Sequence, residues 1–167
     1  MKENYPFCLK QILRYEGGKV DDPRDPGGRT AFGITQATYN DWLTKHGLDR
    51  KDVFTISQDE VAAIYKQNYW DKIRGDDLPD GLDLAVMDYA VNSGVGRAAK
   101  TLQSIVGTTP DGIIGDKTIA AAKAYVAIAL TNKRLSFLQK LSTWAVFGRG
   151  WQNRINDVKK QIVGLVS

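Results

Sequence analysis

The first segment of the chain has apolar positions at the spacing of one helix face, and this stripe ends in a carboxyl group. Its four members follow the i, i+3, i+4, i+7 pattern and are Leu9, Ile12, Leu13 and Glu16. The pattern predicts a helix from Asn4 to Tyr15 or Glu16, because two glycines follow directly and stop it. We therefore expect the Glu16 carboxyl to project from the side of the helix that is buried.

The remaining apolar patterns predict further helices separated by turns. The expected ranges are 35–47, 57–70, 81–91, 98–107, 120–141 in two pieces and 151–163, with Asp116 as a cap and FGRG at 147–150 as a turn. Between residues 17 and 28, four glycines, two prolines and three aspartates exclude regular structure, and residues 29–35 are predicted to be a short extended piece. The sequence thus predicts a mainly α fold with little or no β structure, built as two closely packed helical subdomains, 1–95 and 96–167.

The single cysteine and single histidine limit the metal and redox chemistry of the chain. Cys8 cannot form an internal disulfide, and with only His46 beside it there is no ligand cluster for zinc. We therefore expect no metal, no cofactor and no cysteine–histidine catalytic pair. No run approaches about 18 apolar residues and the start lacks a secretory h-region. We expect a protein made in the cytoplasm, without membrane insertion, that reaches the outside by lysis, a holin-like pore or another route.

Charge is distributed unevenly along the chain. The net charge is +4, but residues 97–167 contain 11 basic and three acidic residues, whereas residues 1–96 contain 12 basic and 16 acidic ones. The basic second half indicates a polyanionic partner, which could be nucleic acid, a membrane face or a bacterial wall with teichoic acid or peptide carboxylates. No nucleic-acid-binding motif accompanies the charge, so a nucleic-acid partner is not expected.

The position of Glu16 is suited to acid catalysis. A carboxyl on an apolar helix face is partly desolvated, and at a helix C-terminus it meets the negative end of the backbone dipole. Both effects favour the protonated form, which the cleavage of a glycosidic bond requires in order to protonate the leaving oxygen. The alternative is an ordinary solvated glutamate in a last helical turn, and the spacing alone favours that reading.

The run from Glu16 to Thr35 combines EGG, DDPxDPGG and RTxxGIT without interruption, and it closely resembles the signature of glycoside hydrolase family 108. This family comprises bacterial and phage N-acetylmuramidases of lysozyme-like fold. The similarity continues in YKQNYWDKI at 65–73 and in DYAVNSG at 88–94, which resembles the cleft motif of lysozymes and lytic transglycosylases. Residues 102–122 resemble peptidoglycan-binding modules, and 147–155 resemble the end of the predicted peptidoglycan domain usually fused to this family. One departure is Lys19, which stands where the family usually has an aromatic residue.

The resemblance implies an endolysin-like peptidoglycan hydrolase in which Glu16 is the catalytic acid. For the second carboxylate Asp25 is the first candidate, since its spacing from Glu16 is similar to that of the acid and aspartate in phage-type lysozymes, and Asp22 is the next. Thr30 lies at the place where those lysozymes have a threonine that positions a water molecule. The ordinary alternatives are turn-forming aspartates and an unremarkable strand threonine. A lytic transglycosylase using the same acid, or a non-catalytic wall-binding or secretion-helper protein, remains open.

A saccharide cleft also needs flat apolar faces and amide groups. Residues that fit by type and by motif are Asp22, Tyr69, Trp70, Tyr89 and Asn92. Aromatic residues at helical spacing are more often core, which we favour for Tyr65 and Trp42, whereas the two interpretations of Trp70 are equally supported. The expected partner is the peptidoglycan glycan strand, bound by a monomer.

Overall fold

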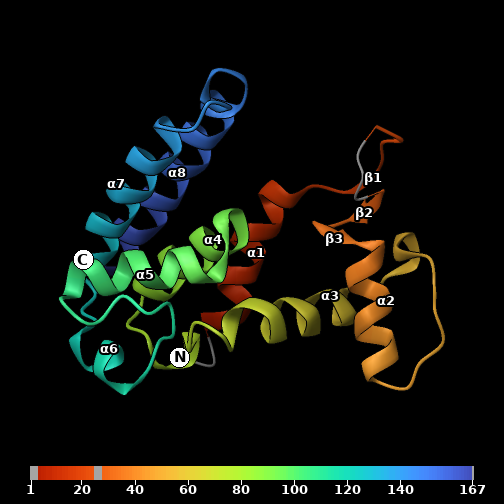
Figure 1. Ribbon diagram of the computed structural model, residues 1–167, viewed down its shortest axis with the longest axis horizontal. Coiled ribbons are helices and arrows are strands. Elements are labelled where there is room, and N and C mark those ends of the chain that lie inside the picture. The colour runs from red at the N-terminus through yellow and green to blue at the C-terminus, as the bar shows by residue number, and fades with distance from the viewer. Residues whose placement is uncertain (1–3, 25–27, 167) are drawn as a thin grey trace. The chain divides into compact units, whose positions relative to one another are not determined.

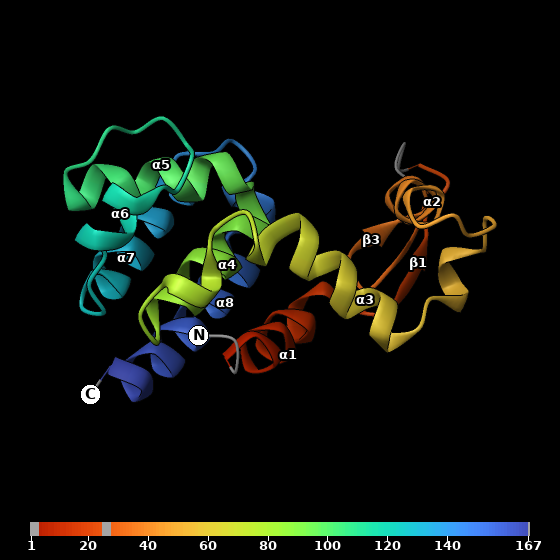
Figure 2. The ribbon, with the colours of Figure 1, turned by 90° about the horizontal axis from the view of Figure 1, so that it is seen from below.

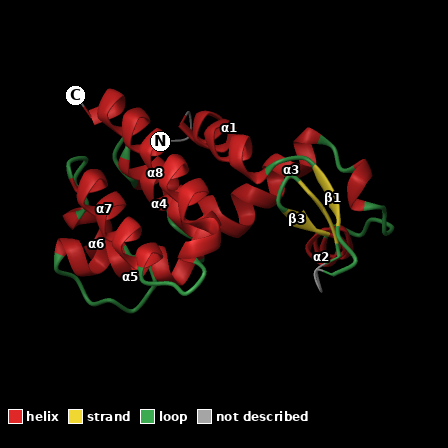
Figure 3. Ribbon diagram, turned by 90° about the horizontal axis from the view of Figure 1, so that it is seen from above, coloured by secondary structure: helices red, strands yellow, loops and turns green. Residues whose placement is uncertain are grey.

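The computed structural model describes residues 4–24 and 28–166, which form two compact units. Residues 9–67 form one of them, here called the sheet unit, and residues 4–8 with 68–166 form the other, called the helical unit. Helix α1 (Asn4–Glu16) begins in the helical unit and ends in the sheet unit. Figure 3 shows that helices dominate and that strands occur only as β1, β2 and β3 of the described chain.

The sheet unit contains three short antiparallel strands in the order β1-β2-β3. They are β1 (Lys19–Asp21), β2 (Arg29–Ala31) and β3 (Ile34–Thr35). Thr30 pairs with Val20 on one side and Thr35 on the other. The link between β2 and β3 is a two-residue turn with positive φ at both positions, 52° at Phe32 and 77° at Gly33. This is the conformation of a type I′ hairpin, so the extended piece expected at 29–35 is a tight hairpin.

Side-chain caps define the helices of the sheet unit. Helix α2 (Gln36–Lys45) begins where Thr35 accepts a hydrogen bond from the Thr38 amide. Helix α3 (Gln58–Tyr65) follows a capping box in which Ser57 and Glu60 satisfy each other's backbone N–H groups. A short 3₁₀ turn, η1 (Val53–Thr55), lies between them. The predicted starts at Thr35 and Ser57 are confirmed.

The helical unit is built around helix α4 (Leu82–Ser93), in which every residue from 82 to 90 is buried. Helices α5, α7 and α8 pack on α4 (Figure 1), and Figure 2 shows α4 and α5 side by side from a second direction. The other elements are η2 (Lys66–Trp70, a π turn that starts in the sheet unit), η3 (Gly75–Asp77), α5 (Val95–Val106), α6 (Asp116–Ala121), α7 (Val126–Gln139) and α8 (Trp144–Val166). The boundary expected near residue 95 therefore falls between two helices that pack together inside one unit.

A buried ion cluster joins three helices of the helical unit. Asp88 on α4 is fully buried and pairs with Arg134 of α7 and with Arg154 of α8, the latter at 2.8 Å. Burial raises the pKa of Asp88, but the two guanidinium charges outweigh this and hold it below its usual range. Among the described atoms, Nε and Nη2 of Arg134 are buried without a hydrogen-bond partner. The cluster thus places two guanidinium groups around one buried carboxylate.

The buried start of α1 belongs to the helical unit. The Asn4 amide donates to Asp80 and Asp83 at 2.8 and 2.9 Å, which ties this end of α1 to the beginning of α4. Cys8 is fully buried, and its burial, followed by the charge of Asp83, raises the pKa of the thiol. Cys8 is thus part of the core of the helical unit.

Two local predictions in the second half are wrong. Residues 147–150 do not form a turn: α8 continues through them, because Gly148 leaves room for the Trp144 ring, which would lie 2.5 Å from an added Cβ. Asp116 is the first residue of α6 rather than its cap, and Gly115 occupies the cap position without a side-chain hydrogen bond. None of the described helices is long and apolar enough to cross a membrane.

Candidate active site

Glu16 is the last residue of α1 and is half-buried. Along the predicted stripe, Leu9 and Ile12 are buried, with exposures of 8% and 0%, and Leu13 is half-buried like Glu16. The helix ends because Gly17 adopts a φ of +69°, a conformation that favours glycine. The stripe thus carries the carboxyl to the edge of the buried face, where it is partly shielded and still reachable from solvent.

The hairpin turn closes directly on the Glu16 carboxyl. A Cβ added to Gly33 would lie 2.8 Å from Glu16 Oε2 and 2.6 Å from the Tyr65 hydroxyl. The same hydroxyl donates a 2.7 Å hydrogen bond to the Phe32 carbonyl. The absence of a side chain at Gly33 therefore allows a turn, a carboxyl and a phenol to meet at one point.

Tyr65, which meets Glu16 and Gly33 here, was expected from the sequence to be a core residue. Its ring is buried, with 2% exposure, as expected. Its hydroxyl, however, reaches the turn that contacts Glu16. Helical spacing shows which face of α3 is buried but not where the end of a long side chain lies, so no sequence signal identified this contact.

The loop after Glu16 is held by surface ion pairs. Asp22 accepts hydrogen bonds from the backbone N–H of Arg24 at 2.9 Å and from its guanidinium, and the guanidinium, with the backbone N–H second, lowers the Asp22 pKa. Arg29 pairs with Asp21 at 3.2 Å and with Asp52 at 2.7 Å. Asp22 therefore combines a turn-forming role with a half-buried carboxylate.

The other candidates of this loop differ in how they are placed. Thr30 is half-buried in the middle strand of the sheet. Asp25 lies outside the described residues. Lys19, where the resembling family has an aromatic residue, has its ammonium 6.0 Å from the Phe54 ring, and Arg29 lies over the same ring at 3.8 Å. Phe54 thus supplies an aromatic ring close to position 19, where the family usually has an aromatic residue and this chain has Lys19.

The remaining candidates belong to the helical unit and are described within it. Trp70 is fully buried: its Nε1 donates to Asp76 at 2.9 Å, its ring packs on Tyr5, and Gly75 lies directly beneath it. Its ring therefore offers no exposed face. Tyr69 is half-buried on the π turn that ends at Trp70.

Tyr89 and Asn92 lie on α4 of the helical unit. Tyr89 is almost fully buried, with 1% exposure, and lies against a surface hollow. Asn92 is half-buried near the end of α4 and accepts a hydrogen bond from Ser93 Oγ at 3.1 Å. Of these two residues, Asn92 has the more accessible polar group.

Comparisons with known proteins agree with the resemblance noted in the sequence. The family profile described as Glycosyl hydrolase 108 matches residues 9–94, which is just over half of the chain. The chain belongs to glycosyl hydrolase family 108. A solved structure described as that of Brucella abortus SagA is 38% identical, with a TM-score of 0.84, and the match covers 99% of this chain and 97% of that one. No curated protein matches the chain significantly.

Membership of family 108 identifies the chain as a glycoside hydrolase of the N-acetylmuramidase kind, with peptidoglycan as the class of substrate. The mainly α, lysozyme-like architecture expected from the sequence is confirmed. The matched range contains all of the sheet unit and, within the helical unit, the whole of α4.

Proposed function

We propose that this family 108 enzyme hydrolyses the bond between N-acetylmuramic acid and N-acetylglucosamine, with Glu16 as the general acid. The carboxyl donates its proton to the glycosidic oxygen as the bond from that oxygen to the muramic acid C1 breaks. Water then adds a hydroxyl group to C1, and the remaining proton of that water passes to a carboxylate that acts as base. The observation that carries the proposal is the convergence of Glu16, Gly33 and Tyr65 at one point. The turn and the buried phenol restrict the space in which the carboxyl can move, and acid catalysis requires a positioned proton donor.

For the second catalytic group we propose Asp25, with Thr30 positioning the attacking water. A second carboxylate works either as a nucleophile about 5–5.5 Å from the acid or as a base about 6.5–9.5 Å away. Asp25 has the spacing from Glu16 that resembles phage-type lysozymes, and its own loop begins at the acid. Asp22 is the alternative, although its carboxylate already accepts hydrogen bonds from Arg24.

Glycan contacts are proposed for the accessible candidates. Asp22, Tyr69 and Asn92 retain partly exposed groups that can bind hydroxyl or N-acetyl groups of a sugar. Phe54 provides a ring surface near Lys19 that can stack on a pyranose. Trp70 is left out because its ring is covered on all sides.

The deciding experiment is the substitution Glu16→Gln, with Glu60→Gln as its matched control. Both replacements remove a half-buried carboxylate, and glutamine at position 60 keeps the capping box intact. We expect Glu16→Gln to lower the rate of wall clearing by about 10²–10⁴-fold or more, because a positioned acid contributes that much, and Glu60→Gln to retain it. Wall clearing by Glu16→Gln at the parent rate would contradict the role of Glu16 as the acid, whereas a parent protein that clears no wall would favour a non-catalytic wall-binding role.

Product masses separate hydrolysis from lytic transglycosylation. Hydrolysis releases muropeptides with a reducing end, whereas a transglycosylase closes an internal anhydro ring, and its products are lighter by one water. We expect reducing-end products, and we expect Asp25→Asn to lower their rate of formation. Anhydro products with unchanged activity of Asp25→Asn would instead show that Glu16 works alone.

A further inference from the structure

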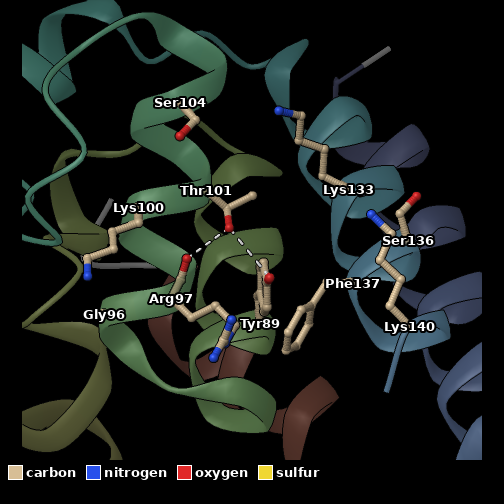
Figure 4. A pocket seen from close by; sticks show the side chains of 10 residues that line it. All are labelled: Tyr89, Gly96, Arg97, Lys100, Thr101, Ser104, Lys133, Ser136, Phe137 and Lys140. Atoms are coloured by element: carbon tan, nitrogen blue, oxygen red, sulfur yellow. Dashed lines mark hydrogen bonds between the residues drawn. The ribbon is translucent and has the colours of Figure 1, made fainter. Parts of the chain in front are cut away.

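The helical unit contains an open hollow of about 750 Å³ between α5 and α7, with α4 at its base. Figure 4 shows residues of α5 along one side and residues of α7 along the other. Six of the side chains carry the argument: the aromatic residues Tyr89 and Phe137 and the cations Arg97, Lys100, Lys133 and Lys140. The volume lies in the range of small-ligand sites, about 300–1,000 Å³.

The base of the hollow is apolar. The Tyr89 and Phe137 rings lie 6.5 Å apart, tilted by 38°. Arg97 lies over the Phe137 ring with its guanidinium carbon 4.2 Å from the ring centre (Figure 4). A guanidinium that stacks by its face keeps its N–H groups in the plane free to bind a carboxylate in a bidentate manner.

The cations of the hollow lack acidic partners. No carboxylate is among the described residues that line it, and within the described chain none of the four cations is in an ion pair. The buried cluster of Asp88, Arg134 and Arg154 contributes to the positive potential of the hollow. Arg134 lies 5.6 Å from the centre of the Tyr89 ring, and two of its nitrogens have no hydrogen-bond partner among the described atoms. Four unpaired cations above an apolar base attract an anion that also has apolar surface.

We propose that this hollow binds the carboxylates of the peptide stems of peptidoglycan. The inference rests on the proposed function for its substrate class and extends it from the glycan to the peptide. A glycan strand whose lactyl groups are linked to peptides has no free carboxylate of its own, whereas each stem ends in carboxylates on a partly aliphatic chain. The stem carboxylate binds Arg97 and the lysines, and the aliphatic part packs on the partly exposed Phe137 ring.

The apolar base favours a peptide over a phosphate polymer. The alditol phosphates of teichoic acid match the positive charge, but their hydrated hydroxyl groups gain nothing from contact with the Phe137 ring. The stacked guanidinium of Arg97 likewise provides a flat fork that suits a carboxylate. Teichoic acid is therefore an outcome of the test that would contradict the proposal.

The test measures binding of Glu16→Gln protein to sacculi, so that cleavage does not interfere. Sacculi with intact stems are compared with sacculi that have been stripped of free stem carboxylates by converting these groups to neutral methylamides, and both are free of teichoic acid. In this background, Lys100→Glu combined with Lys133→Glu is compared with Lys117→Glu combined with Lys123→Glu. The control pair has the same change in charge, and its two lysines are exposed in the helical unit outside the hollow.

We expect the hollow pair to lower binding to stem-bearing sacculi by about tenfold or more, which corresponds to about 1.4 kcal/mol, and to leave binding to stripped sacculi unchanged. The control pair should have little effect on either. Arg97→Lys, which keeps the charge and loses the planar fork, should cause a smaller loss in the same direction and covers the case in which the double variant does not fold.

The outcomes separate this inference from the proposed function. Equal loss on both kinds of sacculi, no loss on either, or binding that appears only when teichoic acid is restored would each overturn the peptide site. Cleavage by the parent enzyme is measured in parallel. If the parent fails to cleave while stem-dependent binding persists, the proposed function is wrong and the peptide site stands. If the parent cleaves but shows no stem-dependent binding, the proposed function stands and the peptide site is wrong.

Discussion

The ion pairs of the two units differ in their exposure to solvent. In the sheet unit, Arg29 pairs with Asp52 at the surface, where 38% and 46% of the two side chains are exposed. In the helical unit, Asp88 pairs with Arg134 and Arg154, and each of the three side chains is less than a tenth exposed. A surface pair contributes little to stability, whereas a buried charge that loses its partner is costly. The helical unit therefore depends on long-range charge pairing, and the sheet unit depends on local backbone geometry.

Local backbone geometry determines the position of Glu16, the candidate acid. The strands of the sheet unit are two or three residues long and β1 is exposed throughout, so the sheet has little core of its own. The turn at Phe32 and Gly33 and the helix end at Gly17 nevertheless determine where the Glu16 carboxyl lies. We therefore expect substitutions in the sheet unit to affect activity before stability, and substitutions in the helical core to affect stability before activity.

The largest effect on stability is expected from Asp88→Asn. Removing this charge takes away the carboxylate that pairs with two buried guanidinium groups, which should lower the free energy of unfolding by about 3–5 kcal/mol. Urea unfolding followed by circular dichroism measures the loss. Asp116→Asn is the matched control, because Asp116 pairs with Arg74 with 96% of its side chain exposed. An equal loss in both variants would remove the contrast between the buried and the exposed ion pairs.

The same variant has a pH signature. The folded pKa of Asp88 is held below its usual range, so its stabilising contribution is complete above the pKa of an unfolded aspartate, about 4, and is lost as the pH falls through the lower folded value. The parent should therefore lose more stability than Asp88→Asn on acidification from about pH 6 to about pH 3. If the stability of the parent and of Asp88→Asn fell in parallel with pH, protonation of Asp88 would not be coupled to unfolding.

A smaller loss of stability, but a clear loss of activity, is expected from Gly33→Ala. The added methyl group would lie 2.8 Å from Glu16 Oε2, so the carboxyl or the turn must move, and wall clearing should fall by about tenfold or more. Gly47→Ala is the control: its φ is +68° against +77°, and its Cβ would meet nothing within 4 Å. Both variants should lose about 1–2 kcal/mol of stability to the positive φ. Equal clearing rates would mean that the close approach at Gly33 has no part in catalysis.

The smallest effect is expected from Ser57→Ala in the capping box of α3. The lost cap should cost about 1 kcal/mol, and Ser57→Asp should restore it, because aspartate caps a helix equally well. Thermal unfolding of the three proteins measures the difference. A loss as large as that of Asp88→Asn would show that the sheet unit is as cooperative as the helical core.

The parts of the fold that could be predicted are those that depend on neighbours in the sequence. The helix starts at residues 35 and 57 could be predicted because the backbone groups that Thr35 and Ser57 cap lie three residues ahead. The end of α1 at Glu16 followed from the two glycines after it. FGRG was misread because two glycines near a break usually mark a turn, whereas here Gly148 accommodates the Trp144 ring within one continuous helix.

The parts that could not be predicted depend on distant residues. Asp88 lies 46 and 66 positions from its two arginine partners, and no periodic pattern links such separations. The meeting of Glu16, Gly33 and Tyr65 likewise joins a helix end, a turn and a second helix. The motif indicated that Glu16 was important, but only the fold shows what surrounds it.

The burial of Cys8 has a consequence for where such an enzyme can work. Bacterial walls lie in surroundings that oxidise exposed thiols, and a protein with one accessible cysteine there would couple to another molecule through a mixed disulfide. A sulfhydryl that is shut inside the helical unit and kept in its protonated state is a poor nucleophile. The chain can therefore keep an odd cysteine in an oxidising environment without becoming covalently linked to itself or to its neighbours.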